Sequence, residues 1–330
     1  MPIIAKNNQN SARRLGMIMD PIASIKPYKD SSFAVLLEAQ KRGWELFFIL
    51  QEKLSVVNNE ICAIAQFLSV TDDNSNWYSL QPEQQLKLSD LDVVFMRKDP
   101  PFDMDYIFST LLLDKLHNAG TLVVNHPQSL RDCNEKIFAS NFPECSPATL
   151  ITSQKTQIIE FLNQQQDIIV KPLDGMGGAS IFRIQKSDPN INVIIETMTN
   201  FGKKLIMVQA FIPEITQGDK RIILIDGEPV DYALARIPSQ GETRANIAAG
   251  GTGVGVPLSE RDYWICAQIA PELKKRGLLF VGIDVIGDYL TEINVTSPTC
   301  IRELDSLYKL NISASLLDVI DKKIAQHLKD

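Results

Sequence analysis

Short apolar runs alternate with amphipathic segments along the first 130 residues, and this alternation restricts the possible folds more than any other feature of the chain. The apolar runs have the length of buried strands and cover residues 15–19, 44–50, 91–97 and 121–125. The amphipathic segments, 31–42 and 104–118, carry apolar residues at helical spacing. Strands that alternate with helices usually form a parallel sheet. We therefore predict a mostly parallel α/β domain over this part of the chain.

Length, charge and cysteine spacing exclude several classes of protein. The chain has 330 residues, enough for about two domains. Its net charge of −7 argues against a nucleic-acid-binding surface, because phosphate contacts need clustered lysine and arginine. The five cysteines are widely spaced and form no CxxC pair, which indicates reduced thiols and a cytoplasmic location. No apolar run reaches ~18 residues, so no membrane span is predicted.

The second half of the chain is richer in predicted strands and turns. Apolar runs predict strands at 168–171, 180–184, 205–209, 221–225, 230–236, 280–286 and 289–295. Helical spacing occurs at 155–165, 191–200, 262–276 and 313–327. The dipeptides Asp226-Gly227 and Gly287-Asp288 predict two hairpin turns. Between them, residues 237–258 hold five of the 17 glycines, which is typical of a lid or of a disordered segment.

A glycine-rich loop, DGMGGAS at 174–180, follows the predicted strand that ends in Lys171. A dinucleotide-binding loop needs a third glycine where this chain has Ser180, and the segment that follows is strand-like instead of helical. A Walker loop would end in Gly-Lys-Ser/Thr, which is absent. Two interpretations stay open: a tight hairpin turn, or a flexible flap whose backbone N–H groups lie on nucleotide phosphates near Lys171.

A second polar stretch, TEIN at 291–294, predicts a metal site. Glu292 and Asn294 lie two residues apart on a strand and therefore point to the same face. Carboxylate and amide oxygens suit a hard cation such as Mg²⁺, and the apolar neighbours make an unpartnered carboxylate costly. Asp284 lies on the preceding strand. A three-residue turn would place it opposite Glu292, whereas a two-residue turn would direct it to the other face.

Two arginines stand out from the other basic residues. Arg221 and Arg236 each interrupt or end an apolar strand of the same predicted hairpin. Buried arginines usually pair with carboxylates or phosphates. We therefore expect each of the two guanidinium groups to pair with a carboxylate or a phosphate.

These segments, taken together, carry a family resemblance. The chain resembles the bacterial glutathione synthetases of the ATP-grasp superfamily along nearly its whole length after residue 15. The matching segments are MDPI at 19–22, MRKDPPFD at 96–103, NHPQSLRDCNEK at 125–136, KPLDGMGGASIFR at 171–183, GDKR at 218–221, GETRANIAAGG at 241–251 and GIDVIGDYLTEINVTSPTCIRE at 282–303. Their joint occurrence is far more specific than the glycine loop alone.

The resemblance implies an α/β architecture, the ATP-grasp fold, preceded by a Rossmann-like parallel α/β domain. The N-terminal domain would cover 1–132, and a central ATP-grasp subdomain with the glycine-rich flap would cover 133–210. A C-terminal ATP-grasp subdomain, 211–330, would carry the lid at 237–258 and the metal site. Family members are commonly tetramers, so the resemblance also implies a homo-oligomer.

The resemblance further implies an ATP-dependent carboxylate–amine ligase. In the family, ATP phosphorylates the cysteinyl carboxylate of γ-glutamylcysteine. The amine of glycine then attacks the acyl phosphate and gives glutathione, ADP and phosphate. Phosphoryl transfer depends mostly on positioning and charge neutralisation, which fits a site of lysines, arginines and a metal. No side chain needs to act as a nucleophile, and the three histidines and five cysteines are interpreted as structural residues.

Matching the family's motifs residue by residue assigns roles to individual positions. The resemblance implies ATP contacts at Lys136, Lys171, Gly177, Gly178, Gln209, Phe211, Ile212 and Asp219. Among these, Asp219 would contact the ribose. The resemblance implies that Mg²⁺ or Mn²⁺ binds to Asp284, Glu292 and Asn294. It implies substrate contacts at Asp20, Arg97, Arg236 and Arg244. It implies catalytic roles for Arg221, Arg236 and Arg244.

The chain departs from the family pattern at two places, and two alternative functions stay open. About a dozen N-terminal residues have no counterpart in many members, and Thr252 stands near the end of the lid where relatives often have an arginine. A sister ATP-grasp ligase would use the same ATP and metal residues with another carboxylate and amine. A regulatory or scaffold protein without turnover is the second alternative, and intact Lys171, Glu292 and Asn294 argue against it.

Overall fold

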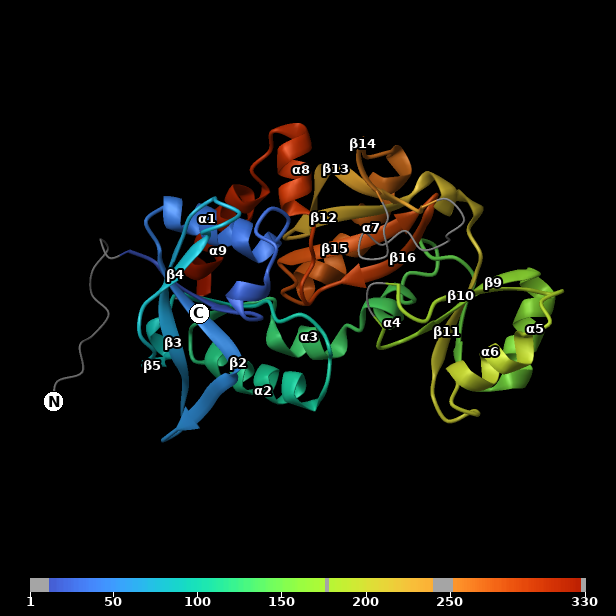
Figure 1. Ribbon diagram of the computed structural model, residues 1–330, viewed down its shortest axis with the longest axis horizontal. Helices are drawn as coiled ribbons and strands as arrows, with labels where there is room; N and C mark the ends of the chain where they lie inside the picture. The colour runs from blue at the N-terminus through green and yellow to red at the C-terminus, as the bar shows by residue number, and fades with distance from the viewer. Residues whose placement is uncertain (1–11, 176–177, 240–251, 328–330) are drawn as a thin grey trace.

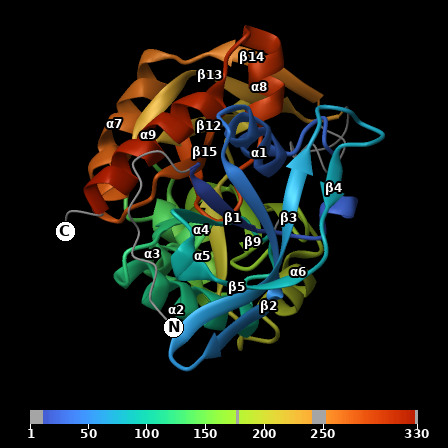
Figure 2. The same ribbon diagram turned by 90° about the vertical axis from the view of Figure 1, so that its left-hand side faces the viewer.

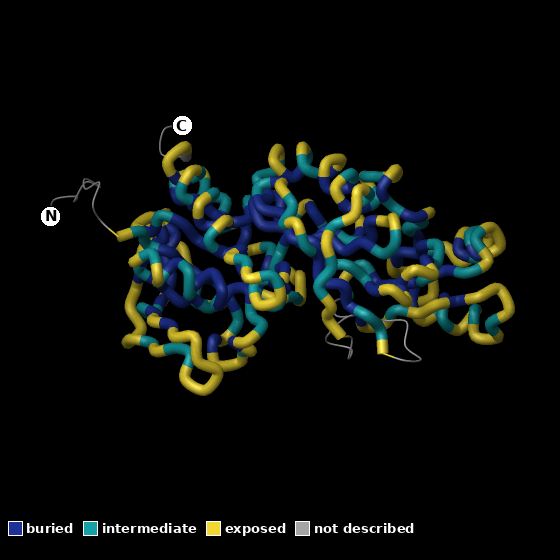
Figure 3. Tube along the Cα trace, turned by 90° about the horizontal axis from the view of Figure 1, so that it is seen from above, coloured by how far each residue is buried: buried dark blue, intermediate teal, exposed yellow. Residues whose placement is uncertain are grey.

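The computed structural model describes residues 12–175, 178–239 and 252–327. These residues form three sheets arranged in a row, with the N-terminal sheet at one end and a small four-stranded sheet at the other (Figure 1). A five-stranded sheet lies between them. Buried segments run through the centre of each part, and exposed segments lie at the margins (Figure 3).

The N-terminal sheet has seven strands in the order β4-β3-β2-β1-β6-β7, with β5 paired to β3. They are β1 (Arg14–Ile18), β2 (Glu45–Val57), β3 (Glu60–Val70), β4 (Tyr78–Leu80), β5 (Gln84–Lys87), β6 (Val93–Met96) and β7 (Leu122–Val124). The predicted parallel unit is confirmed for β2, β1, β6 and β7. The sequence prediction misses the antiparallel strands β3, β4 and β5. Strands β4 and β5 are short and mostly exposed, and β3 pairs with both the buried first part and the more exposed second part of β2.

Helices cover both faces of this sheet. They are η1 (Ile22–Ser24), α1 (Ser31–Lys41), η2 (Leu88–Asp90), α2 (Met104–Asn118) and α3 (Pro127–Asp132). Asp30 and Asp103 are the N-cap residues of α1 and α2, because each side chain accepts a hydrogen bond from the backbone N–H three residues later in the chain. Successive residues of β6 point to opposite faces, so Val93 and Phe95 pack in one core and Val94 in the other. Both predicted helices are confirmed.

The four-stranded sheet has the order β10-β9-β11-β8 and is antiparallel throughout. This part of the chain comprises α4 (Glu135–Ala139), β8 (Thr149–Thr152), α5 (Lys155–Gln165), β9 (Asp167–Pro172), β10 (Phe182–Gln185), α6 (Ile191–Met198) and β11 (Ile206–Ala210). Helices α5 and α6 pack on one face through Ile158, Leu162 and Ile195. Alternate residues of β9 and β11, among them Lys171 and Gln209, therefore point to the other face. The sequence prediction misses β8, which is short, mostly half-exposed and at the sheet edge.

The five-stranded sheet is antiparallel in the order β14-β13-β12-β15-β16. Its part of the chain comprises η3 (Pro213–Gln217), β12 (Asp219–Ile225), β13 (Glu228–Ile237), β14 (Thr252–Pro257), α7 (Glu260–Lys275), β15 (Phe280–Ile286), β16 (Tyr289–Asn294), α8 (Ile301–Tyr308) and α9 (Ile312–His327). Both predicted hairpins are confirmed. The predicted lid at 237–258 needs correction, because its last part is the edge strand β14, whose two glycines weaken the strand signal. Residues 240–251 of that lid lie outside the described residues.

The C-terminal helix α9 returns to the N-terminal sheet. It lies beside α1 (Figure 2), and the two helices share a core that includes Phe33, Leu316 and Ile320. Arg42, just after α1, donates a hydrogen bond to Asp318 of α9 at 2.8 Å. The first and last parts of the described chain are therefore fixed to each other, which holds the N-terminal sheet against the five-stranded sheet.

All five cysteines lie inside the protein as free thiols, in keeping with their interpretation as packing residues. Burial raises the pKa of Cys133 to about 11 and that of Cys266 to about 12. A thiol with so high a pKa is a poor nucleophile near neutral pH. Among the helices of the described chain, none has the length and apolar character needed to cross a membrane.

Candidate active site

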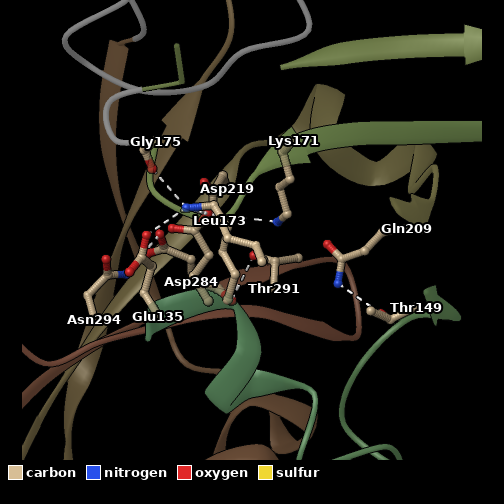
Figure 4. A network of polar contacts seen from close by, with 12 residues as sticks. Glu135, Thr149, Lys171, Leu173, Gly175, Gln209, Asp219, Asp284, Thr291 and Asn294 are labelled. Carbon is tan, nitrogen blue, oxygen red and sulfur yellow. Dashed lines mark hydrogen bonds and ion pairs between the residues drawn. The ribbon is translucent and has the colours of Figure 1, made fainter. Parts of the chain in front are cut away.

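A cleft of about 150 Å³ lies between the glycine loop after β9 and strands β12, β15 and β16 (Figure 4). Helix α3, the start of α4 and the segment before α2 also line it. The charged and amide side chains in and directly behind this cleft include Asn134, Glu135, Lys136, Lys171, Asp174, Arg221, Asp284, Glu292 and Asn294. The fold thus brings together residues that lie more than 150 positions apart in the chain.

Two buried lysines converge on one carboxylate. Lys136 of α4 places Nζ 3.6 Å from Oε1 of Glu292, and Lys171 of β9 places Nζ 3.8 Å from the same oxygen. Lys136 also contacts Glu135 at 2.7 Å. Burial lowers the pKa of Lys171. Burial acts in the same direction on Lys136, but the carboxylates of Glu292 and Glu135 outweigh it and raise the pKa.

Asn134 ties α4 to the base of the glycine loop. Its side-chain oxygen accepts hydrogen bonds from the N–H groups of Lys136 and Ile137, which caps the helix. Its amide nitrogen donates to the carbonyl of Leu173 at 2.9 Å. The ammonium group of Lys136 donates to the carbonyl of Gly175 at 2.8 Å. The loop therefore leaves the sheet from a fixed position beside both lysines.

Asp284 lies at the centre of a buried charge network. Arg221 donates to both of its oxygens, with Nε 2.5 Å from Oδ1 and Nη2 3.0 Å from Oδ2. Arg236 Nη2 lies 3.0 Å from Oδ1, and Asn294 donates to Oδ2 at 3.3 Å. Burial acts to raise the pKa of Asp284, but the two guanidinium groups hold that pKa well below its usual range. Both arginines thus pair with a carboxylate, as predicted.

Asp284 and Glu292 lie directly opposite each other on β15 and β16. The turn between these strands has two residues, and strand alternation alone would then direct Asp284 to the other face. A β-bulge restores the register, because Thr291 is an extra residue in β16 and its Oγ1 donates to the carbonyl of Asp284 at 3.1 Å. The prediction that a two-residue turn directs Asp284 to the other face is therefore wrong, because the length of a turn does not show whether a bulge lies in the adjoining strand.

The three predicted metal ligands lie side by side. Asp284, Glu292 and Asn294 offer carboxylate and amide oxygens, the donors that hard divalent cations prefer. In the described ranges there is no group of three or more His, Cys, Asp or Glu placed to hold a metal, so such a site would depend on two carboxylates and one amide. Asp284 would have to share its oxygens with the guanidinium groups. The donor types fit a cation such as Mg²⁺.

Asp219, at the start of β12, pairs with Arg236 across the β12–β13 hairpin. Nη2 of Arg236 lies 2.5 Å from Oδ2, whereas no residue of the described chain bonds to Oδ1. Burial raises the pKa of Asp219 to about 7; Arg236 opposes this rise, and Asp284 and Glu292 add to it. The side chain points toward the cluster of Lys171 and Asp284 (Figure 4). Its contact with the ribose stays a prediction.

Strand β11 and the residues after it form the predicted adenine-facing hinge. Gln209 is buried, and its Nε2 donates to Oγ1 of Thr149 at 3.0 Å. The ring of Phe211 lies under the guanidinium group of Arg183, whose Cζ is 3.6 Å from the ring centroid. Ile212 is buried just beyond it. Contacts of these residues with a nucleotide stay predictions.

The strands on both sides of the glycine loop pair with each other, because β9 and β10 are antiparallel neighbours. This confirms a strand–loop–strand unit, whereas a dinucleotide-binding loop would open a helix. Gly178 has φ of 81°, a conformation that favours glycine. Gly177 of this loop and Arg244 of the predicted lid lie outside the described residues.

The other predicted substrate contacts lie at the carboxyl ends of β1 and β6, the edge where parallel α/β sheets bind ligands. Arg97 follows β6 and is 5% exposed. Its Nε donates to Oγ of Ser32 at 3.0 Å, and its Nη2 donates to the carbonyl of Pro298 at 2.8 Å. Asp20 follows β1 and pairs with Lys98 at 2.7 Å. The roles of Arg97 and Asp20 toward a substrate stay predictions.

Three residues that shape the site are absent from the sequence prediction. Glu135 and Asn134 lie in the motif NHPQSLRDCNEK, and their position next to Lys136 in the sequence is a signal that could have placed them in the site. Ser32 gave no such signal, because its hydrogen bond with Arg97 joins residues 65 positions apart.

The chain matches two domains of one known protein family and is similar to proteins named for that family. Residues 14–131 match the N-terminal domain of prokaryotic glutathione synthetase, and residues 135–309 match its ATP-grasp domain. The glutathione synthetase of Pseudomonas putida is 58% identical over 94% of this chain and 98% of its own length. The glutathione synthetase of Escherichia coli O6:H1 is 54% identical over 95% of this chain and 99% of its own.

Solved structures of ATP-grasp enzymes have the same overall arrangement. D-cycloserine synthetase DcsG has a TM-score of 0.63 at 13% identity and covers 93% of this chain and 99% of its own. The ATP-grasp ligase PsnB, complexed with a minimal precursor, Mg and ADP, has a TM-score of 0.61 at 15% identity, covering 94% and 98%. At such low identity the likeness shows the fold alone, and that fold is the predicted ATP-grasp fold.

Proposed function

The chain belongs to the prokaryotic glutathione synthetases and is thus an ATP-dependent ligase that joins γ-glutamylcysteine to glycine, and we propose which side chains carry out this reaction. The observation that supports the proposal most is the convergence of Lys136 and Lys171 on Glu292, beside Asp284 and Asn294, in one cleft. Buried ammonium groups next to carboxylate and amide oxygens suit a nucleoside triphosphate with a divalent cation.

Lys136 and Lys171 bind the phosphates of ATP, and the glycine loop covers them with its backbone N–H groups. Asp284, Glu292 and Asn294 hold the divalent cation, which is Mg²⁺ or Mn²⁺. The bound cation neutralises charge on the phosphates. In this arrangement Glu292 keeps the two ammonium groups in place before ATP arrives.

Arg221 and Arg236 stabilise charge on the reacting groups. In the first step an oxygen of the cysteinyl carboxylate attacks the γ-phosphorus and ADP leaves. In the second, the amine of glycine attacks the carbonyl carbon, loses a proton, and phosphate leaves with the carboxylate oxygen. Both steps place negative charge on oxygens near fixed guanidinium groups, which Asp284 orients. Arg244, from the lid, takes part in the same way, a role that the family resemblance alone supports.

The nucleoside of ATP lies along Gln209–Ile212, with Phe211 in that segment, and Asp219 faces its ribose. Support for the hinge comes from its position on the sheet face that also carries Lys171, opposite the apolar core of α5 and α6. Gly177 and Gly178 belong to the flap over the phosphates. On the other side of the cleft, Asp20 and Arg97 contact γ-glutamylcysteine.

A panel of substrate omissions tests this function. Phosphate release is expected only when ATP, Mg²⁺, γ-glutamylcysteine and glycine are all present, and chelation of the cation by EDTA should stop it. Equal turnover with D-alanine in place of glycine, or without the dipeptide, would contradict the proposal and favour a sister ligase. Binding of ATP without any turnover would favour a regulatory or scaffold protein.

We also propose that the chain forms a homo-oligomer, a tetramer as the resemblance implies, in the cytoplasm. Helix α2 exposes Met104, Phe108 and Leu111 at the spacing of one helical face, and exposed apolar faces often mark protein contacts. Five buried free thiols fit a reducing compartment. Sedimentation velocity should give a mass that is a multiple of the chain mass. The substitution Phe108→Asp should shift the measured mass toward that of a single chain. A wild type that sediments as a single chain would contradict the oligomer.

A further inference from the structure

A guanidinium group at the carboxyl end of β6 has no carboxylate partner in the described part of the chain. Arg97 is fixed by Ser32 and by the carbonyl of Pro298, and no described residue bonds to its Nη1. Burial lowers the pKa of Arg97. A buried cation without a counter-ion is costly, so this position favours an anionic ligand.

Asp30 places the opposite charge beside it. The residue caps α1, and its Oδ1 accepts the N–H of Phe33 at 2.7 Å. It lies two residues before Ser32, whose hydroxyl holds Arg97. Burial raises the pKa of Asp30, and the charge of Arg97 acts against that rise. The two groups are thus close enough to interact, yet within the described ranges they form no ion pair with each other or with another side chain.

The other carboxylates near Arg97 are less suited to bind a cationic group. Asp20 is already paired with Lys98 and accepts the N–H of Asp99. The side chain of Asp99 belongs to an exposed residue. Of Asp20, Asp30 and Asp99, Asp30 is therefore the partly buried carboxylate that has no ion pair among the described residues.

Two of the segments that line the reaction cleft also hold Arg97. The lining includes Pro100 and Thr296, which come from the same two segments as Arg97 and its acceptor carbonyl. Glu292 lines the same cleft. A dipeptide whose reacting carboxylate lies beside Glu292 would therefore have its far end available to these two segments.

We propose that Arg97 and Asp30 together bind the α-amino acid head of the γ-glutamyl group, Arg97 its α-carboxylate and Asp30 its α-ammonium. The inference rests on the proposed function, because γ-glutamylcysteine carries this zwitterionic head opposite its reacting cysteinyl carboxylate. Asp30 becomes a specificity-determining residue. A dipeptide without the α-amino group leaves the Asp30 carboxylate unpaired, and sites built to bind a polar group reject analogues that lack it.

The test compares γ-glutamylcysteine with glutarylcysteine, which lacks only the α-amino group. The wild type is expected to prefer γ-glutamylcysteine by ~100-fold or more in kcat/KM. In Asp30→Asn the preference should fall below about tenfold, because the charge is lost while the helix cap is kept. The KM for ATP should not change. Asp99→Asn, the matched control, should retain the wild-type preference.

An Asp30→Asn enzyme with the wild-type preference would overturn the inference, and so would an Asp99→Asn enzyme that loses the preference to the same extent. Asp30→Ser provides a second charge-free cap if the asparagine variant folds poorly, and circular dichroism checks both. A wild type that does not turn over γ-glutamylcysteine would contradict the proposed function itself and the inference with it.

Discussion

Replacing Glu292 with glutamine is expected to lower kcat by about 10³-fold or more, because metal-assisted charge stabilisation amounts to several kcal/mol and each 1.4 kcal/mol is a factor of ten. Glutamine keeps the shape of the side chain but removes the charge that faces Lys136 and Lys171. The fold should persist, since Glu292 is a partly exposed residue at the cleft. Steady-state phosphate release at saturating cation, with circular dichroism as a check on folding, measures both effects.

Glu135→Gln is the matched control for this variant. Glu135 contacts Lys136 as Glu292 does, but it lies on α4 and is not part of the opposed pair of Asp284 and Glu292 on β15 and β16. Its loss should reduce kcat by less than about tenfold, the effect of one partly exposed charge contact. Equal losses in the two variants would show that Glu292 acts only as a partner of the lysine, and normal activity of Glu292→Gln would remove it from the metal site.

Asp284→Asn is expected to lower the free energy of unfolding by about 3–5 kcal/mol, the usual cost of removing one partner from a buried ion pair. Both guanidinium groups that contact Asp284 are buried, and Arg221 would lose its ion-pair partner in the described part of the chain. Activity should fall as well, because Arg221 and Arg236 would lose the group that orients them. Chemical denaturation of the wild type and the variant measures the difference in stability.

An exposed ion pair gives the control for that measurement. Lys274 and Glu228 contact each other at 2.6 Å, but Glu228 has 75% of its side chain exposed. Exposed pairs contribute little, so Glu228→Gln should change the free energy of unfolding by less than about 1 kcal/mol. If Asp284→Asn has an equally small effect, the buried network does not stabilise the fold in the way described.

The parts of the fold that the sequence predicts are those with a strong local pattern. Strands β1, β6 and β7 are buried on both faces, so each appears as a continuous apolar run. The hairpin between β12 and β13 is marked by Asp226-Gly227, where the chain takes positive φ angles. In these elements local composition and tertiary position favour the same conformation.

The elements that escape prediction depend on contacts made far along the chain. Strand β14 contains Gly253 and Gly255 and exists because it pairs with the edge of β13. Gly255 also lies under the ring of Tyr308, which leaves no room for a larger side chain. The bulge at Thr291 likewise has no composition signal, although it decides which face Asp284 occupies.

The candidate site shows the same division. The residue types suited to phosphate and to a metal could be recognised in the sequence, but not their partners within the protein. That Lys136 and Lys171 share Glu292 follows from where α4 and β9 meet β16, more than 100 residues later in the chain. That Arg236 contacts both Asp219 and Asp284 follows from the order β13-β12-β15. Such partners are set by tertiary structure.

The transfer of an oxygen label tests the central claim most directly. We would supply γ-glutamylcysteine labelled with ¹⁸O in both oxygens of the cysteinyl carboxylate, together with ATP, Mg²⁺ and glycine, and analyse the released phosphate by mass spectrometry. An acyl-phosphate intermediate predicts one ¹⁸O in each phosphate, because the carboxylate oxygen that attacks the γ-phosphorus leaves with it. Unlabelled phosphate released during glutathione formation would contradict the account.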